Sequence, residues 1–155
     1  AGSGYRVEHA VVINKPAAVL YSFWRRFENL PRFMNHLEEV KQLDAKRSHW
    51  KAKAPLGLSV EWDAEVITER TNELIGWRSL PGGDVDNAGA VHFTPVAGGT
   101  EVRVTLKYDP PAGKVGATVA RLLGESPEVQ VRDDLNRFKQ LMEAGGTPAA
   151  AGMYD

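Results

Sequence analysis

The sequence has 155 residues and contains no cysteine. Without thiols, a disulfide framework, a cysteine nucleophile and a zinc site with cysteine ligands are all excluded. No apolar run approaches the roughly 20 residues of a membrane-spanning helix. An excess of one charge sign is also missing, because 19 basic residues face 20 acidic ones for a net charge of −1. This balance provides no electrostatic reason to expect nucleic acid or an anionic membrane as a partner.

The chain length suits one domain with a sizeable core. We interpret residues 1–143 as that domain. Residues 144–155, "AGGTPAAAGMYD", are small, rich in Gly, Pro and Ala, and aperiodic, so we expect a flexible tail. The first residues, "AGSGYRVE", lack the apolar segment of a signal peptide. A cytoplasmic protein without stable membrane insertion is therefore the expectation.

Alternation of apolar and polar residues predicts about seven strands. The first is "YRVEHAVVI" at 5–13, and the others are expected at about 39–44, 48–54, 59–68, 74–80, 88–96 and 100–108. The connections "DAKRS", "ERTNE" and "AGGT" are short and polar, as antiparallel hairpins require. The predicted sheet is therefore an antiparallel meander.

Helical periodicity appears at two places. Two short helices are expected after the first strand, one with Pro16 in its first turn and one opened by Pro31. A long C-terminal helix is expected from about Lys114, interrupted near Gly124, with a new start at Pro127.

Strand parity divides the sheet into an apolar and a polar face, as expected for an antiparallel sheet that is covered on one side. The apolar face includes the tryptophans at positions 50, 62 and 77, with alanines 52, 54 and 64 beside them. Arg78 falls on the polar face, where we expect a surface ion pair near Asp63 and Glu61. The cover over the apolar face must be helical.

Three connections rich in Gly and Pro meet at one end of this meander. They are "APLGLS", "LPGGDVDNAG" and "YDPPAGKVG". Irregular loops at one rim of a curved sheet commonly form the mouth of a cavity. Ser79, Asn87 and Tyr108 lie near this mouth and are the candidate polar contacts.

Several segments resemble proteins of the START-like, or SRPBCC, superfamily, in particular bacterial polyketide cyclase/dehydrase-like proteins. They are "SFWRRFENLPRFMNHLEEV", "SHWKAKAPLGLSVEWDAEV", "IGWRSLPGGDVDNAGAVHF", "GGTEVRVTLKYDPPAG" and "RLLGESPEVQVRDDLNRFKQLME". The resemblance covers about 5–143. It implies an α+β helix-grip fold, in which a curved antiparallel sheet wraps around a long C-terminal helix. Relatives include aromatic polyketide cyclases, coenzyme Q-binding proteins and lipid-transfer domains, which share an apolar cavity rather than one reaction.

The principal hypothesis is that the chain binds a small apolar molecule, such as a polyketide, quinone, isoprenoid or lipid. The tryptophans could fill a plain core or line the cavity. We expect Trp62 to be the most buried of the three and Trp77 to face the cavity most. The predicted ligand-binding residues are Trp50, Trp62, Trp77, Ser79, Val91, Phe93, Val104, Leu106, Tyr108, Val115, Val119 and Leu122.

Two alternatives stay open. A cyclase or dehydratase acting on such a ligand needs a buried acid–base group that reaches the cavity, and only His9, Tyr108 and Asp134 qualify. A module that docks on a protein partner needs an apolar patch outside the cavity.

No catalytic or cofactor motif accompanies these residues. His36, His49 and His92 lack the mutual spacing of metal ligands, so we expect no metal and no cofactor. The segment "YDPPAGKVGAT" has Tyr108 where a phosphate-binding loop needs its first glycine.

Overall fold

The computed structural model describes residues 5–109 and 127–145. Its elements, in chain order, are β1 (Tyr5–Ile13), α1 (Ala17–Arg25), η1 (Phe27–Arg32), β2 (Leu37–Gln42), β3 (Arg47–Lys53), η2 (Pro55–Gly57), β4 (Ser59–Arg70), β5 (Leu74–Ser79), β6 (Asp86–Val96), β7 (Gly99–Asp109) and α3 (Pro127–Glu143). The predicted strands are all present, with ends that differ by a few residues.

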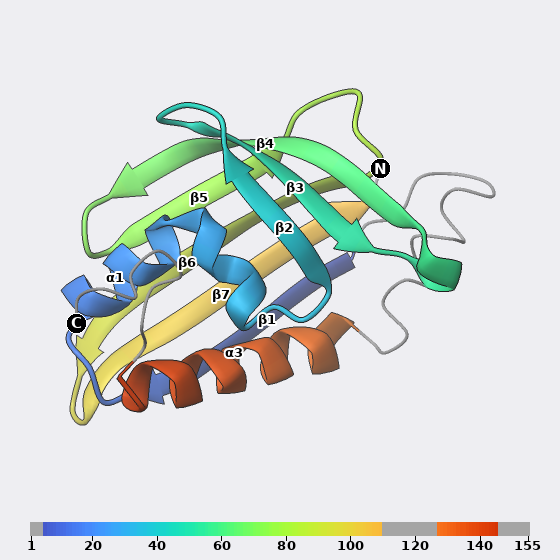
Figure 1. The fold of residues 1–155 in the computed structure, drawn as a ribbon. Helices are drawn as coiled ribbons and strands as arrows, with labels where there is room; N and C mark the ends of the chain where they lie inside the picture. The colour runs from blue at the N-terminus through green and yellow to red at the C-terminus, as the bar shows by residue number, and fades with distance from the viewer. Residues whose placement is uncertain (1–4, 110–126, 146–155) are drawn as a thin grey trace.

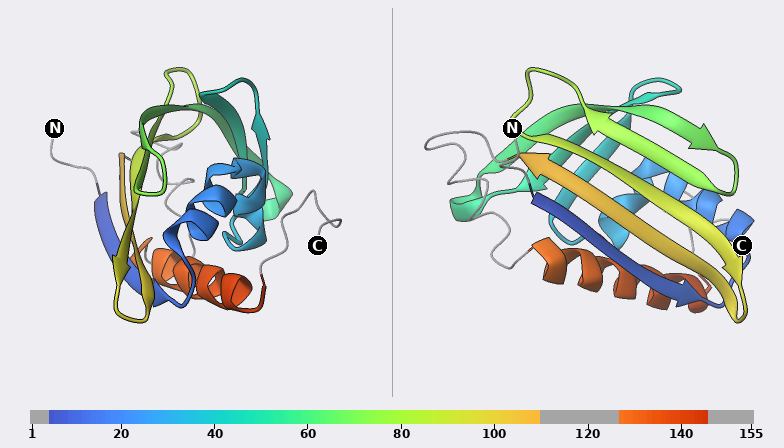
Figure 2. Two further views of the ribbon diagram at one scale, coloured as in Figure 1. Left: turned by 90° about the vertical axis from the view of Figure 1, so that its left-hand side faces the viewer. Right: turned by 180° about the vertical axis from the view of Figure 1, so that it is seen from behind.

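The strands form one seven-stranded antiparallel sheet in the order β1-β7-β6-β5-β4-β3-β2 (Figure 1). From β2 to β7 each strand pairs with the next along the chain, as short hairpin connections dictate. Figure 2 shows this sheet curling around α1, η1 and α3 on one side. The α+β helix-grip fold is therefore confirmed.

The two short helices after β1 are also present. α1 starts directly after Pro16. The second, η1, is a 3₁₀ helix that begins at Phe27 and contains Pro31 near its end, so the prediction that Pro31 opens this helix is wrong. The helix begins earlier because the N–H of Asn29 already reaches the Arg26 carbonyl at 2.8 Å.

The predicted strand parity holds in β3 and in the first part of β4, before the register shift between Val66 and Thr68. In β3 and β4 the inward residues, among them Trp50, Ala52, Trp62 and Ala64, are buried, while their neighbours are half-buried or exposed. The sheet thus has one apolar face, and the helices supply its cover. Large rings from α1, η1 and α3 complete the core on that side, including Trp24, Phe27 and Phe138.

The C-terminal end of α3 is tied to β1. The Glu143 carboxylate accepts a hydrogen bond of 2.9 Å from the N–H of Asn14, and the Lys139 ammonium donates to the Val12 carbonyl at 2.5 Å. In the middle of α3, Phe138 meets the ring of Phe33 at 4.7 Å between centroids. The N-terminal turns of α3 are left to face the other end of the sheet.

Part of the prediction for the C-terminal region lies outside the described residues. This applies to the interruption near Gly124, to the apolar stripe of Val115, Val119 and Leu122, and to 146–155 of the expected tail. The start at Pro127 agrees with the sequence expectation.

Candidate ligand-binding site

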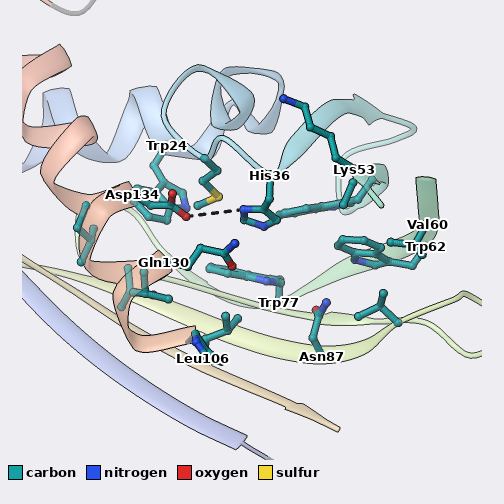
Figure 3. A pocket seen from close by; sticks show the side chains of 18 residues that line it. Trp24, His36, Lys53, Val60, Trp62, Trp77, Asn87, Leu106, Gln130 and Asp134 are labelled. Atoms are coloured by element: carbon teal, nitrogen blue, oxygen red, sulfur yellow. Dashed lines mark ion pairs between the residues drawn. The ribbon is translucent and has the colours of Figure 1, made fainter. Parts of the chain in front are cut away.

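A cavity of about 130 Å³ lies between the curved sheet and the first turns of α3. Its sheet wall carries Trp50, Trp62 and Trp77, and its helix wall carries Val131 and Leu135. Figure 3 shows Trp62 and Trp77 on the side of the cavity opposite Asp134 of α3. Further wall residues come from α1, from the segment between η1 and β2, from both sides of the connection around η2, from Val85 and Asn87 around the start of β6, and from β7. The cavity thus lies toward the end of the sheet where the Gly- and Pro-rich connections occur.

The three tryptophans form a stack with Trp50 in the middle. Its ring lies 5.9 Å from that of Trp62 and 6.5 Å from that of Trp77, with interplanar angles of 25° and 23°. The Trp50 indole N–H donates to the hydroxyl of Ser48 at 2.8 Å. Aromatic pairs at these separations attract one another beyond their burial. The rings are therefore core and cavity wall at the same time.

The expectation that Trp62 is the most buried of the three tryptophans is wrong. Trp50, Trp62 and Trp77 are 5%, 7% and 5% exposed, so Trp62 is not the most buried. The physical reason is contact with other rings: Trp50 and Trp77 both pack against Phe27 in addition to their stacking neighbours, whereas Trp62 stacks on Trp50. Strand position alone does not contain this information.

Two glycines leave the space that the side chains of Trp62 and Trp77 occupy. A Cβ atom at Gly89 would lie 2.5 Å from the ring of Trp77, its partner in the ladder between β5 and β6. A Cβ atom at Gly83 would lie 2.6 Å from the Cβ of Trp62. The "PGG" segment runs back along β4, held by hydrogen bonds such as that of 2.9 Å from Asp84 N–H to the Glu61 carbonyl. Small residues are required where the backbone approaches this closely.

The structure brings five of the predicted site residues together on the cavity wall. They are Trp50, Trp62, Trp77, Val104 and Leu106. For Tyr108 only the backbone in β7 is described, and Val115, Val119 and Leu122 lie outside the described residues. The role of these residues in binding remains a prediction.

Three other predicted residues lie away from the cavity. Val91 and Phe93 are buried on the inner face of β6, but the ring of Phe93 packs against Tyr21 at 5.7 Å and so belongs to the core under α1. Ser79 accepts a hydrogen bond of 2.9 Å from the N–H of Asn87 and is engaged with the chain itself. Asn87 does line the cavity. Parity identifies the face of a strand but not the position along it, which explains the difference.

The cavity also contains polar residues that sequence patterns did not place there, including His36, which lies between η1 and β2, and Gln130 on α3. Irregular loops carry no periodicity, so no sequence pattern identifies His36. Gln130 lies one helical turn before Asp134, which the sequence indicates as a candidate acid–base residue of the cavity. The i, i+4 spacing places both side chains on one face of the helix and could have identified Gln130.

Asp134 lines the cavity from α3 and is buried, with only 9% of its side chain exposed. Its carboxylate accepts a hydrogen bond from Arg137, one turn later on the same helix. Burial raises the pKa of Asp134 to about 7, against the lowering effect of the Arg137 guanidinium. The carboxyl group therefore exchanges its proton near neutral pH.

His36 faces Asp134 across one end of the cavity. The distance from its Nδ1 to an Asp134 carboxylate oxygen is 3.9 Å, too long for a hydrogen bond. Among the described residues this buried Nδ1 has no hydrogen-bond partner. Burial lowers the pKa of His36 to about 4, and the positive charges of Arg137 and Lys53 add to the effect. The imidazole is thus neutral at physiological pH.

The other candidate acid–base and surface residues lie elsewhere. His9 is half-buried on β1 and is not part of the cavity wall. Arg78 is on the outer face, with 60% of its side chain exposed, as predicted. Its partner is Glu65, at 3.6 Å, rather than Asp63 or Glu61. The ladder between β4 and β5 pairs Arg78 directly with Glu65, which explains the difference.

Within 5–109 and 127–145, no helix is long and apolar enough to cross a membrane. The same ranges hold no cluster of three His, Asp or Glu side chains suited to a metal ion.

The fold and its apolar cavity agree with a comparison of the chain with protein families. Residues 13–136 match the family described as polyketide cyclase / dehydrase and lipid transport. The chain belongs to this family. Membership, together with the confirmed helix-grip fold, gives the protein a fold that binds hydrophobic ligands.

Individual relatives support the same assignment. A 17.2 kDa protein of Streptomyces lincolnensis, described as uncharacterised, is 30% identical over 141 residues, which is 91% of each chain. A crystal structure of a Deinococcus radiodurans protein shares 43% identity and a TM-score of 0.75, covering 91% of this chain and 98% of that one. An aromatase/cyclase from a Streptomyces species has a TM-score of 0.72 at 18% identity over 93% of this chain and 99% of its own, a likeness of fold alone.

Proposed function

We propose that this protein binds a small apolar molecule, of the polyketide, quinone, isoprenoid or lipid kind, in the cavity between the sheet and α3. The observation that carries the proposal is the stack of three tryptophans on the cavity wall. An aromatic wall presents flat, rigid surface, and most of the other wall side chains are aliphatic. Pockets of this make-up, with a few polar groups, are typical of sites for small organic ligands.

Burial of apolar surface supplies the driving force. A ligand that buries about 200 Å² of apolar area would gain roughly 5 kcal/mol before the cost of its lost freedom. Flat conjugated ligands would gain further from offset stacking on the indole rings. Planar aromatic or polyene molecules are thus the preferred class.

A cavity-filling substitution tests the proposal. Ala52 is 4% exposed and lines the cavity, so Ala52→Leu places extra side-chain volume inside it. We expect the affinity for the neutral dye N-phenyl-1-naphthylamine, measured by quenching of tryptophan fluorescence, to fall at least about tenfold. Mass spectrometry of organic extracts from the purified protein would identify a natural ligand.

A matched control lies on the other side of the sheet. Ala90 belongs to β6, where its neighbour Val91 points inward, and it does not line the cavity. Ala90→Leu should leave dye binding unchanged. If both variants bind the dye like the unmodified protein, the dye sits elsewhere and the proposal fails.

A second candidate function is catalysis, as a cyclase or dehydratase acting on such a ligand. It is favoured by Asp134, a cavity-lining carboxyl group whose pKa of about 7 suits proton transfer at neutral pH. We would incubate the protein with aromatic β-hydroxyketones and follow loss of water by mass spectrometry. Turnover that survives in Asp134→Asn, or ligand binding without any turnover, would count against the enzyme and leave the binding function intact.

A further inference from the structure

The polar end of the cavity is built around the carboxylate oxygen of Asp134 that Arg137 does not engage. Arg137 engages one oxygen of Asp134, and the other oxygen faces the imidazole of His36 at 3.9 Å. Figure 3 shows Asp134 pointing from α3 toward His36, with Gln130 beside them. This end of the cavity therefore presents a strong hydrogen-bond acceptor at one point of an otherwise largely apolar wall.

The positive charges nearby do not reach into the cavity. Arg137 stands behind Asp134, where it also donates to the Phe33 carbonyl at 2.9 Å, and it is not part of the wall. Lys53 does contribute to the wall, but its ammonium group points away from the other labelled side chains in Figure 3. Among the described residues, no cation is aimed at the cavity interior.

His36 contributes to the same end of the cavity a buried nitrogen without a hydrogen-bond partner in the described part of the chain. Its Nδ1 is buried and lacks a partner among the described residues, and the ring is neutral. An unpaired buried polar atom is costly, and native proteins rarely retain one without a reason. A shift that closes the 3.9 Å gap, or a ligand group that engages the imidazole and the carboxylate together, would satisfy it.

We propose that Asp134, His36 and Gln130 select uncharged ligands that carry a hydroxyl group, such as phenols, and exclude ligands that end in a carboxylate. The inference rests on the proposed binding function and adds the chemical class of the ligand's polar end.

The selection follows from the charge at this end of the cavity. A ligand hydroxyl donates to the Asp134 oxygen that faces His36 in a charge-assisted hydrogen bond, while its own oxygen can accept from Gln130 or His36. A ligand carboxylate would lose its water beside a second carboxylate, and among the described residues no cation aimed into the cavity offsets the repulsion. The two ligand classes thus differ by one attractive and one repulsive contact.

Matched probes test the selection. The probes are 4-propylphenol, propylbenzene and 4-propylbenzoate, which share ring and chain and differ only in the polar end. Isothermal titration calorimetry at pH 8 measures each affinity, with Asp134 mostly ionised. We expect the phenol to bind about tenfold more tightly than propylbenzene, and the benzoate at least about tenfold more weakly than the phenol.

A pair of variants on α3 separates the local contact from general charge. Asp134→Asn removes the cavity-facing charge at constant shape, and the ratio of phenol to benzoate affinity should fall at least about fivefold. Asp133→Asn removes the same charge one residue earlier, at a side chain that pairs with Arg132 outside the cavity wall. This control should leave the ratio unchanged.

A change of pH tests the selection in the unmodified protein, without any substitution. The groups facing Asp134 are Arg137 and Asp133 from its own helix, His36 and the Asn35 N–H from the segment before β2, with Lys53 of β3 acting on His36. Of these groups, Asp134 is the one expected to change charge between pH 8 and pH 5.5. Its protonation should weaken the selection against 4-propylbenzoate by about fivefold or more.

The outcomes are distinguishable from those of the binding proposal. Equal affinities for the three probes would overturn the selection and leave apolar binding supported. Equal effects of the two variants, or a ratio that does not change with pH, would also overturn it. If none of the probes binds, both the selection and the binding function are rejected.

Discussion

Trp77 lies directly opposite Gly89 on the neighbouring strand, and its ring fills the space where a side chain at position 89 would begin. The distance from an added Cβ to the nearest ring atom would be 2.5 Å, shorter than van der Waals contact allows. The position of a cavity-lining ring therefore depends on a missing side chain in the strand beside it.

Gly89→Ala should move Trp77 and reshape the cavity. The added methyl group cannot coexist with the present ring position, so we expect a loss of about 1–3 kcal/mol in the free energy of unfolding and altered affinity for a neutral dye. Urea denaturation and fluorescence titration measure the two effects. Gly76→Ala is the matched control, because a Cβ there would meet Thr68 at an ordinary 3.4 Å. Similar losses in both variants would contradict the prediction.

Trp50→Ala should be the most destabilising of the three tryptophan replacements. Trp50 stacks on both Trp62 and Trp77, contacts Phe27 at 5.7 Å, and its N–H is bound by Ser48. We expect a loss of about 3–5 kcal/mol, as for a large core side chain. Trp62→Ala should cost about 1 kcal/mol less, because that ring has one stacking neighbour and partly borders empty space. Equilibrium unfolding in urea checks the order, and a larger loss for Trp62→Ala would refute it.

His36 should make the fold sensitive to acid. Its pKa is lowered from 6.5 to about 4 in the folded protein, so its contribution is complete above pH 6.5 and is lost as the pH falls toward 4. At 1.36 kcal/mol per pKa unit, the loss is on the order of 3 kcal/mol. Urea unfolding of the unmodified protein and of His36→Gln between pH 8 and pH 4 measures this loss. The variant has no imidazole at position 36 and should lack the corresponding fall in the free energy of unfolding.

His49 provides the control of opposite sign. Hydrogen bonds to Glu61 and Asp63 raise its pKa, so its contribution is present below pH 6.5 and is lost as the pH rises through the raised value. His49→Gln should therefore leave the contribution of His36 to the acid-sensitive part of the profile unchanged. An acid profile that is the same with and without His36 would show that the imidazole is not held neutral by burial.

Arg78→Ala should change neither folding nor binding. The side chain is 60% exposed and its ion pair with Glu65 spans 3.6 Å on the outer face. Exposed pairs contribute about 0–1 kcal/mol, so the free energy of unfolding should fall by no more than that. Dye affinity should be unaltered. A tenfold loss of affinity in a folded variant would mean that the outer face communicates with the cavity.

The sequence by itself determined the sheet, its parity and its meander order. Side chains alternate across a strand, so the apolar sets that contain Trp50 and Trp62 specify which face is buried, and short polar connections force neighbouring strands to pair. The same local rules placed Arg78 outside and the start of α3 at Pro127. Each of these features depends on residues close together in the chain.

Only the tertiary structure decided the polar end of the cavity. His36 follows a 3₁₀ helix and Asp134 lies on the last helix, and no periodicity relates two residues that are so far apart in the chain. Contacts between distant segments also determine how deeply each tryptophan is buried. They likewise place Phe93 in the core under α1 rather than in the cavity wall. The curvature of the sheet determines which inward residues meet a helix and which border empty space. Curvature arises from all the strands together, so no single segment of the sequence encodes it.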